Sequence, residues 1–490
     1  ISSQYKVFVM TIRKLFFLLL AWAGFFSCHA PHAGAKPNVL FLICDDLNCD
    51  ISCYGHPLVK TPHIDRLARR GVRFENAYCQ YPLCGPSRAS FMTGMYPDQT
   101  LVRTNPVFVR QTVPNVVTMP QLFRQNGYFT TRIGKIFHYR VPRGIGSSGY
   151  DDPYSWDLAI NPRGRDKKDE PLIFSVKPGE YGGYLSWLAA EGDDGEQTDG
   201  IAVRTAARLI TEYGREQKPF FLAIGLYRPH TPYVAPQKYF DLYPPETMII
   251  PEVPDGYLNT IPVPVQKKLM KKKEHYNLSK PLARQAKQAY YAAVTFADAQ
   301  IGIVLDALDE AGLSDETIVV FTSDHGYHLG EHRHWLKTTL FENAARVPLI
   351  IAGPGITAQG QSTTSLAELT DLYPTLADLC GLHPPQNLSG VSLVNILTDT
   401  SRQARTSALT QLKSDYSVRT PQYRYTEWGE QGSDGIELYD HKTDPEEMKN
   451  LAGDERYDQV RQKLSLLLRM RIKEANRVPA GVRQVHFEVD

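Results

Sequence analysis

A cysteine stands at the head of the stretch whose residue types most suggest chemistry, CGPSRASFMTG at residues 84–94. Pro86 to Ser90 can begin a helix and Gly94 can end it, which places Cys84 at a helix N-terminus. Unpaired backbone N–H groups and the positive end of the helix dipole favour anionic chemistry there. Because free cysteine is also among the most buried residue types, this stretch alone is equally consistent with a structural role.

Acidic residues follow two apolar runs that are typical of buried strands. Asp45 and Asp46 come directly after VLFLIC. Asp324 and His325 come directly after IVVFTS, 279 residues later (324 − 45). Since open α/β sheets bind ligands at the carboxyl ends of their strands, we expect the three carboxylates to converge. Converging like charges require a cation, and oxygen ligands without a cysteine cluster indicate calcium or magnesium rather than zinc.

Separated cations and histidines complete this set of candidates. Three carboxylates and one dication remain net negative, so sulfuryl or phosphoryl transfer at this edge requires additional cations. The candidates are Arg88, Lys135 and Lys337. His138, three residues after Lys135, and His230, three residues after the end of the predicted strand FFLAIGLY, are candidate proton donors or acceptors. Taken singly, a lysine or arginine is usually solvated surface, and spacing alone would select none of these three. Each histidine is equally consistent with a structural role.

Alternating apolar strands and long helices must position these residues. This alternation predicts an α/β domain around a large, mostly parallel mixed sheet flanked by helices. In TPHIDRLARRG, Thr61, Pro62 and Gly71 mark the start and the end of a helix. The other predicted strands are KPFFLAIGLY, ETIVVFTSDHG and RVPLIIAGPG, and the other predicted helices are TDGIAVRTAARLITEYGREQ, LARQAKQAYYAAVTFADAQIGIVLDALDEAGL and SLAELTDLYPTLADLCG.

Two regions depart from this alternation. Residues 140–200 are rich in Gly, Asp, Pro and Tyr without periodicity, and we expect long surface loops there. From about residue 400, short strands and a final helix around residues 459–474 predict a smaller C-terminal α+β subdomain. We therefore divide the chain into upstream residues with a secretory signal peptide (1–35), a catalytic domain (36–398) and this subdomain (399–490).

The bulk composition excludes some classes of partner. The 490 residues have a net charge of +1 at pH 7 and are 42% hydrophobic, so a large core is available and nothing indicates nucleic-acid binding. The seven cysteines show neither zinc-ligand spacing nor a dense disulfide framework. Eight Lys and Arg residues lie between Lys267 and Lys287. A solvated linker is the simpler interpretation, and a patch that attracts a polyanionic substrate is the alternative.

The stretch MTIRKLFFLLLAWAGFFSCHA predicts export. Two cations precede an apolar run at residues 15–26, and small residues follow, as in a secretory signal peptide. The run is shorter than the roughly 20 residues that cross a bilayer, so we expect no transmembrane span in the mature chain. The destination is the periplasm or the extracellular space, or the lysosome in a eukaryote. A lipid anchor at Cys28 is not expected, because Phe25 and Phe26 fit a lipobox poorly.

Together, these motifs resemble the formylglycine-dependent sulfatases of the alkaline-phosphatase superfamily, and in particular the iduronate-2-sulfatase branch. NVLFLICDDL, CGPSR, GKIFH, RPHTP, SDHGYHLGEHRHWLK and LYDHKTDPEEMKNLA carry the resemblance, in this order, over nearly all of the exported chain. CGPSR matches the C-x-P-S-R core in which a formylglycine-generating enzyme oxidises the cysteine of this family. The TGM at residues 93–95 departs from the usual T-G-R or T-G-K. Because the core is intact, we still expect conversion.

The resemblance implies hydrolysis of sulfate esters by a hydrated formylglycine at position 84. One hydroxyl of this geminal diol attacks the ester sulfur and the alcohol departs; the other then loses its proton, sulfate is expelled and the aldehyde returns. The implied roles are calcium binding by Asp45, Asp46, Asp324, His325 and modified Cys84, stabilisation of the diol by Arg88 and Lys135, assistance of sulfate elimination by His138, and sulfate binding by Lys337 and His230, with His230 as the acid for the leaving oxygen.

The same resemblance favours 2-O-sulfated uronate, of the iduronate 2-sulfate type, in glycosaminoglycan-like polysaccharides as the sulfated carbohydrate substrate. Another sulfated sugar and choline sulfate remain open, as does a phosphoester hydrolase of the same superfamily, although such relatives commonly have Ser or Thr at position 84. A non-enzymatic protein that binds sulfated glycans is the third alternative. We expect specificity to reside in residues 96–115, in residues 140–200 and in the C-terminal subdomain. Tyr327 is either a pocket wall or a packing residue.

Overall fold

The structure is a computed structural model that describes residues 36–276 and 278–486. The predicted signal peptide and Cys28 lie outside the described residues. From Pro37 onward the described residues form one compact unit. The six described cysteines are free thiols.

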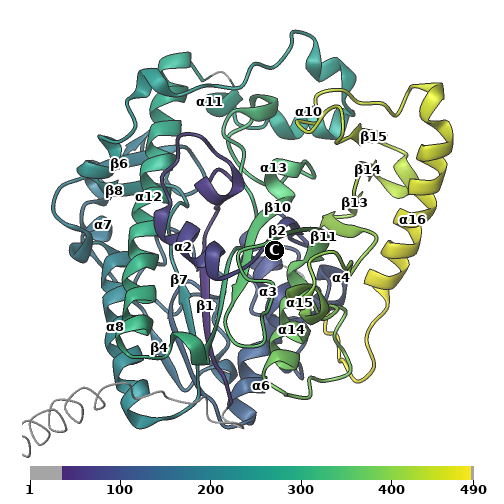
Figure 1. Cartoon of the computed structure of the whole chain (residues 1–490). Helices are drawn as coiled ribbons and strands as arrows, with labels where there is room; N and C mark the ends of the chain where they lie inside the picture. The colour runs from purple at the N-terminus through teal and green to yellow at the C-terminus, as the bar shows by residue number, and fades with distance from the viewer. Residues whose placement is uncertain (1–35, 277, 487–490) are drawn as a thin grey trace, which may run out of the picture. The chain divides into compact units, whose positions relative to one another are not determined.

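A mixed eight-stranded sheet forms the centre of this unit, in the order β11-β2-β10-β9-β1-β7-β3-β4 (Figure 1). β10 runs antiparallel to β2 and β9, and the other neighbours pair in parallel. The prediction of a large, mostly parallel sheet is therefore confirmed. The strands are β1 Asn38–Cys44, β2 Gly71–Tyr78, β3 Phe129–Gly134, β4 Leu158–Ile160, β7 Phe220–Gly225, β9 Thr317–Ser323, β10 Arg346–Ala352 and β11 Ser362–Glu368.

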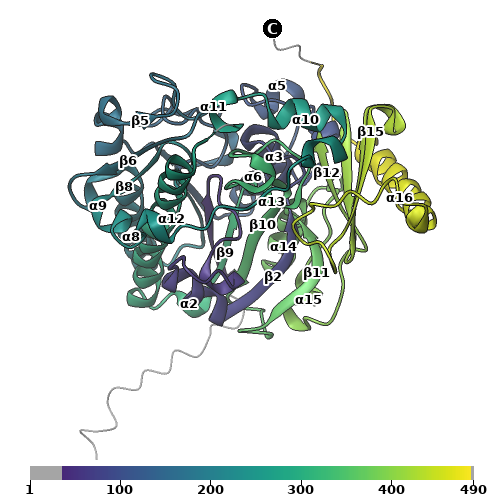
Figure 2. The same cartoon turned by 90° about the horizontal axis from the view of Figure 1, so that it is seen from above.

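Helices cover both faces of this sheet (Figures 1 and 2). Because side chains alternate along a strand, Leu40 and Leu42 of β1 enter one core and Phe41 enters the other. The first core contains α2 Pro62–Arg70, α8 Thr198–Glu216 and α12 Lys280–Glu310. The second contains α3 Cys84–Thr93, α6 Met119–Gln125 and α14 Leu372–Leu379. Every residue of β1, β7 and β9 is buried, as expected for strands covered on both faces.

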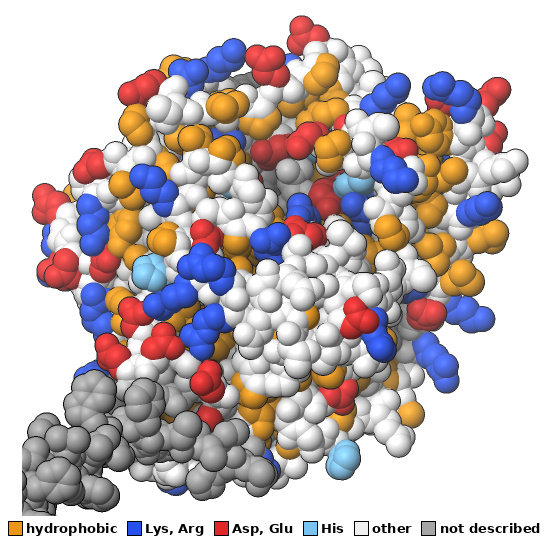
Figure 3. Space-filling model, viewed as in Figure 1, with side chains coloured by type: hydrophobic (Ala, Val, Ile, Leu, Met, Phe, Trp, Pro, Cys, Tyr) orange, Lys and Arg blue, Asp and Glu red, His pale blue; other side chains and the backbone are white. Residues whose placement is uncertain are grey.

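The central helix α12 is the one described helix that is long and apolar enough to cross a membrane. Its most apolar window is 83% buried inside the protein, so it is a core helix here. The short helices are α4 Pro97–Thr100, α5 Val109–Thr112, α7 Arg165–Lys168, α9 Gln237–Phe240, α10 Val263–Leu269, α11 Lys273–Tyr276, α13 Glu342–Ala345 and α15 Val394–Thr398. On the face seen in Figure 3, acidic and basic side chains are interspersed.

A second, antiparallel sheet follows the large one and confirms the predicted C-terminal α+β part. Its order is β12-β13-β14-β15, and helix α16 Asp458–Asn476 packs on it through Leu464 and Leu468. The strands are β12 Ala408–Leu412, β13 Asp415–Arg419, β14 Tyr423–Trp428 and β15 Gly435–Asp440. The domain boundaries at residues 35 and 398 stay predictions.

Two predictions of secondary structure are wrong. Residues 140–200 are not only loops, because β4 joins the large sheet and β5 Phe174–Ser175 and β6 Ser186–Ala190 form a three-stranded sheet with β8 Tyr233–Pro236. SLAELTDLYPTLADLCG is not one helix, because its first residues extend β11 along β2 and α14 begins only at Leu372. Pairing with distant strands overrides the local pattern in both places.

Candidate active site

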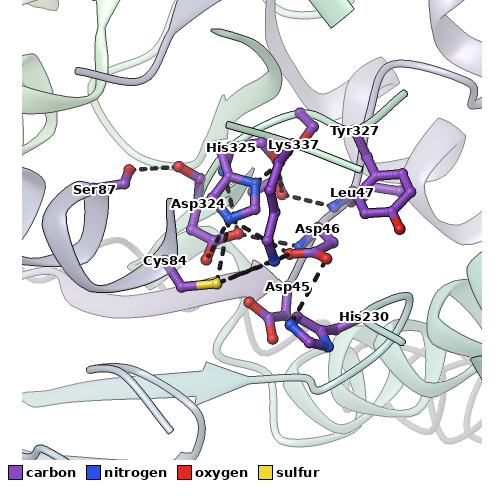
Figure 4. Close-up of polar contacts among 12 residues, drawn as sticks. Asp45, Asp46, Leu47, Cys84, Ser87, His230, Asp324, His325, Tyr327 and Lys337 are labelled. Atoms are coloured by element: carbon purple, nitrogen blue, oxygen red, sulfur yellow. Dashed lines mark hydrogen bonds and ion pairs between the residues drawn. The ribbon is translucent and has the colours of Figure 1, made fainter. Parts of the chain in front are cut away.

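The carboxyl ends of β1 and β9 lie side by side, because these strands are parallel neighbours in the sheet. Asp45 and Asp46 follow β1, and Asp324 and His325 follow β9 (Figure 4). The Asp46 N–H donates to Asp324 Oδ1 at 3.1 Å. All four side chains are at most 1% exposed. The predicted convergence of three carboxylates is therefore present in the structure.

Helix α3 brings Cys84 to these carboxylates. The helix begins at Cys84, as predicted, and ends at Gly94 with a left-handed φ of 66°. The Cys84 Sγ lies 3.3 Å from His325 Nε2 and 3.9 Å from Asp46 Oδ1. Burial and the charge of Asp45 raise the pKa of the thiol well above its usual value, although it stands at a helix N-terminus. Cysteine at this position is therefore an un-ionised thiol at neutral pH.

Arg88 joins the two strand ends. Its Nε donates to Asp324 Oδ2 at 2.9 Å and its Nη2 donates to Asp45 Oδ1 at 3.1 Å. Its Nη1 donates to the carbonyl oxygens of Lys135 and Ile136 at 2.5 and 2.9 Å. Lys135, which follows β3, forms an ion pair with Asp45. Although burial opposes ionisation, Arg88 holds the pKa of Asp324 well below its usual range, and Lys135 lowers that of Asp45.

Lys337 forms an ion pair with Asp46. Its Nζ also lies 3.4 Å from Cys84 Sγ. Burial alone lowers the pKa of Lys337, but Asp46 outweighs burial and raises it above the ordinary value. Burial, with the like charge of Asp45, raises the pKa of Asp46 to about 7 in spite of Lys337. Asp46 therefore has the least compensating positive charge of the three carboxylates.

The two candidate histidines differ in their contacts. His230 Nε2 lies 3.8 Å from Asp46 Oδ2, and its Nδ1 lies 2.5 Å from the carbonyl oxygen of Thr231. Burial and the charge of Lys337 lower the pKa of His230 well below its usual value. His138 is buried and its ring stacks on Tyr150 with 5.8 Å between centroids. No described carboxylate forms an ion pair with His138, and its Nδ1 has no partner among the described residues.

The donor set fits a hard dication. The site contains two groups of possible ligand atoms, and within each group all atoms lie within 4.8 Å of one another. Carboxylate oxygens are the most numerous of these atoms, which suits a hard cation. Three buried cations already balance three carboxylates, so a bound dication would give the site a net positive charge that suits a sulfate ester. The first group is Asp45, Asp46, Cys84 and His230, and the second is Cys84, Asp324 and His325.

Comparison with known proteins identifies the family. Residues 37–382 match the Sulfatase family, and residues 330–474 match the family described as N-sulphoglucosamine sulphohydrolase, C-terminal. The chain belongs to the sulfatase family. It is 33% identical to iduronate 2-sulfatase from Mus musculus in an alignment 473 residues long, which covers 80% of this chain and 84% of that protein. This sulfatase is therefore a sulfuric ester hydrolase.

Two further relatives extend the comparison. The sulfatase is 31% identical to choline-sulfatase from Rhizobium meliloti in an alignment 447 residues long, which covers 85% of this chain and 82% of that protein. A solved structure of a 2-O GAG sulfatase is 27% identical, has a TM-score of 0.70 and covers 90% of this chain and 92% of that chain. The fold is thus that of the alkaline-phosphatase superfamily, as predicted.

A cavity of about 710 Å³ opens beside the site and is lined by His230 and Lys337. Residues from all three regions that we expected to determine specificity also line it, namely Arg103, Gly183 and Trp428. The basic stretch that begins in α10 also reaches this cavity, which is lined by Lys267, Lys268, Lys271 and Lys272. Lys267 and Lys271 are exposed, as expected for a solvated segment, and helix α12 begins at Lys280.

Tyr327 packs in the core and does not line this cavity. Its side chain is fully buried and its hydroxyl donates to the carbonyl oxygen of Trp335 at 3.0 Å. Its ring stacks on Tyr290 with 5.7 Å between centroids. Of the two interpretations of Tyr327, packing is therefore the one that the structure supports.

Proposed function

We propose that this sulfatase hydrolyses 2-O-sulfated uronate, of the iduronate 2-sulfate type, in glycosaminoglycan-like polysaccharides, with formylglycine at position 84 and one Ca²⁺ ion. The observation that carries the proposal is the placement of Cys84, at the start of α3 and within 3.9 Å of Asp46 and His325. Similarity to iduronate 2-sulfatase and to the 2-O GAG sulfatase supports the choice of ester. A formylglycine-generating enzyme is then a required partner, and export through the predicted signal peptide is part of the proposal.

Strand-end carboxylates would hold the calcium ion. When bound, Ca²⁺ would polarise the sulfate oxygens and screen their charge from the surrounding carboxylates. Arg88 and Lys135 fix the orientation of Asp45 and Asp324 through the contacts described above. The ligands would be Asp45, Asp46, Asp324 and His325, together with residue 84.

The remaining side chains act on the sulfate and on protons. Lys337 and His230 line the cavity and would bind the sulfate oxygens. His230 would give its proton to the leaving oxygen. Because burial and Lys337 keep its imidazole neutral in the free site, His230 would first take up a proton from solvent together with the anionic ester. Lys337 would be the poorer donor, because the carboxylates around it raise its pKa. His138 Nδ1, which has no partner among the described residues, would accept the proton of the second formylglycine hydroxyl as sulfate is expelled.

Chemical analysis of residue 84 tests the proposal. Mass spectrometry of the active enzyme should find an aldehyde in place of the Cys84 thiol, and Cys84→Ala should abolish sulfate release without changing thermal unfolding. Cys84→Ser is the matched control: it retains one hydroxyl, forms a stable sulfate ester and should give at most a single turnover. Calcium chelation should lower activity and added Ca²⁺ should restore it. Fully active enzyme with only unmodified cysteine would refute the proposal.

A further inference from the structure

Four lysines form one wall of the cavity beside the site. This lysine wall comes from α10 and the residues that follow it, and the same cavity contains His230 and Lys337. Arg103 and Lys413 contribute two further cations to the lining, and Asp415 is the one acidic residue among the described residues that line it. The lysine wall consists of Lys267, Lys268, Lys271 and Lys272.

Protein groups do not neutralise the lysine wall. None of its four side chains forms an ion pair with a described carboxylate, whereas Arg103 is paired with Asp98 at 2.5 Å and Lys337 with Asp46. Lys272 donates instead to the carbonyl oxygen of Gly183 and lies 4.2 Å from the centroid of the Tyr184 ring. The wall therefore presents a local excess of positive charge to the cavity.

The lysine wall is fixed in place. Val265 and Leu269 of α10 are 1% exposed and pack in the same core cluster as Leu412 and Trp428. After the wall, His275 Nε2 accepts a hydrogen bond from the Leu185 N–H at 3.0 Å. Since buried contacts hold the segment on both sides, its lysines face the cavity without being ordered by a ligand.

We propose that the lysine wall is a second anion subsite, which binds a carboxylate or a further sulfate of a polyanionic substrate while the scissile sulfate lies at His230 and Lys337. This inference rests on the proposed function and narrows it to oligosaccharides that carry at least one anion besides the scissile ester. The same charges repel a quaternary ammonium group, so choline sulfate is disfavoured as a substrate although a choline-sulfatase is among the relatives.

Selectivity between esters tests the subsite. The polyanionic probe is a 2-O-sulfated uronate oligosaccharide with one additional sulfate, and the monoanionic probe is nitrophenyl sulfate. The measured quantity is kcat/KM for the polyanionic probe divided by kcat/KM for the monoanionic probe. In the Lys268→Met/Lys272→Met double variant this ratio should fall about tenfold to a hundredfold, mainly because KM for the polyanionic probe rises. Lys273→Met is the matched control, because Lys273 lies next to the wall but does not line the cavity, and its ratio should equal that of the wild type.

Two further arms decide between the outcomes. With the carboxyl-reduced oligosaccharide, a persisting loss assigns the subsite to the sulfate and a vanishing loss assigns it to the carboxylate. Binding of the oligosaccharide is then measured on Cys84→Ala protein, which needs no turnover. Adding the two lysine changes should weaken this binding by the same factor by which they lower the kcat/KM ratio. If the wild type hydrolyses neither ester, the proposed function fails and the binding arm alone decides the subsite. If the two lysine changes altered neither the kcat/KM ratio nor the binding of the oligosaccharide, the proposal of an anion subsite would be overturned.

Discussion

Through Arg88, one planar side chain connects two strand ends that are far apart in the sequence. It contacts Asp45 and Asp324 with different nitrogen atoms and two backbone carbonyls with a third, and it is fully buried. A lysine ammonium cannot reproduce this fork, because it is a single point charge. The site thus depends on guanidinium geometry as well as on charge.

We therefore predict that Arg88→Lys lowers sulfatase activity at least about a hundredfold and destabilises the fold by about 3 kcal/mol, since it leaves buried carboxylates incompletely paired. Urea unfolding and sulfate release measure the two effects. Arg124→Lys is the control: Arg124 is exposed, pairs with Asp157 at 2.7 Å and should change stability by less than about 0.5 kcal/mol. Wild-type stability of Arg88→Lys would show that the buried network does not need the fork.

The lysine wall should make binding of the polyanion dependent on pH. Burial lowers the pKa of Lys268 and of Lys272 to about 8, so both lysines lose charge between pH 7 and pH 9. Over this range KM for the polyanionic oligosaccharide should rise roughly tenfold. The groups that face these two lysines are Lys177, Lys271, Glu274, Lys337, Lys413 and Asp415.

Steady-state kinetics at constant ionic strength measure this rise. In Lys268→Arg/Lys272→Arg protein it should disappear, because guanidinium groups stay charged throughout. Nitrophenyl sulfate serves as the substrate control for pH effects at the reacting centre. A rise of equal size in the arginine variant would assign the pH dependence to other groups.

Among the elements, α2 shows that a helix end can be stabilised by a distant helix. Thr61 stands at the predicted N-cap, but its hydroxyl accepts from the Ser52 N–H at 3.0 Å rather than from α2. Asp298 of α12 takes this role, and accepts from the N–H groups of His63 at 3.1 Å and Ile64 at 2.8 Å. Asp298 therefore fixes α2 against α12 beneath the sheet.

Asp298→Ala should destabilise the protein by about 2 kcal/mol, because it leaves two helix N-terminal N–H groups without an acceptor. Asp298→Asn retains an acceptor and should lose less stability.

Burial raises the pKa of Asp298 to about 7, so the folded state holds the proton more tightly than the unfolded state. Tighter binding of this proton therefore stabilises the folded state at low pH, and this stabilisation is lost as pH rises from about 4 to about 7. Urea unfolding across this range should show a weaker pH dependence for Asp298→Asn, and equal dependence would contradict the assignment.

The sequence predicts those elements whose patterns are local. Uninterrupted apolar runs end at Asp46 and Asp324, and the prolyl turn after Cys84 marks the start of α3, so the convergence of these residues could be inferred. The strands β6 and β11 could not be inferred, because they exist through pairing with β8 and β2. The lysine wall has the composition of a solvated linker, and only contacts between distant segments show that it lines the cavity.

For the whole molecule, net charge conceals this local arrangement. The chain has a formal charge of +1, and acidic and basic side chains are interspersed over the face in Figure 3. The cavity wall nevertheless concentrates four lysines opposite one acidic residue, Asp415. Long-range steering by the net charge is therefore weak, and attraction of a polyanion depends on the field close to the cavity.

Ionic strength should expose this field. Because the Debye length is about 10 Å at 0.1 M salt, raising salt from about 0.02 M to about 0.2 M should lower kcat/KM for the polyanionic oligosaccharide severalfold. The loss for nitrophenyl sulfate should be much smaller, because its one charge meets the buried cations of the reacting centre. Lys268→Met/Lys272→Met should flatten the first dependence, whereas Lys273→Met should retain it. Equal slopes for both esters would mean that the lysines act only through the shape of the cavity wall.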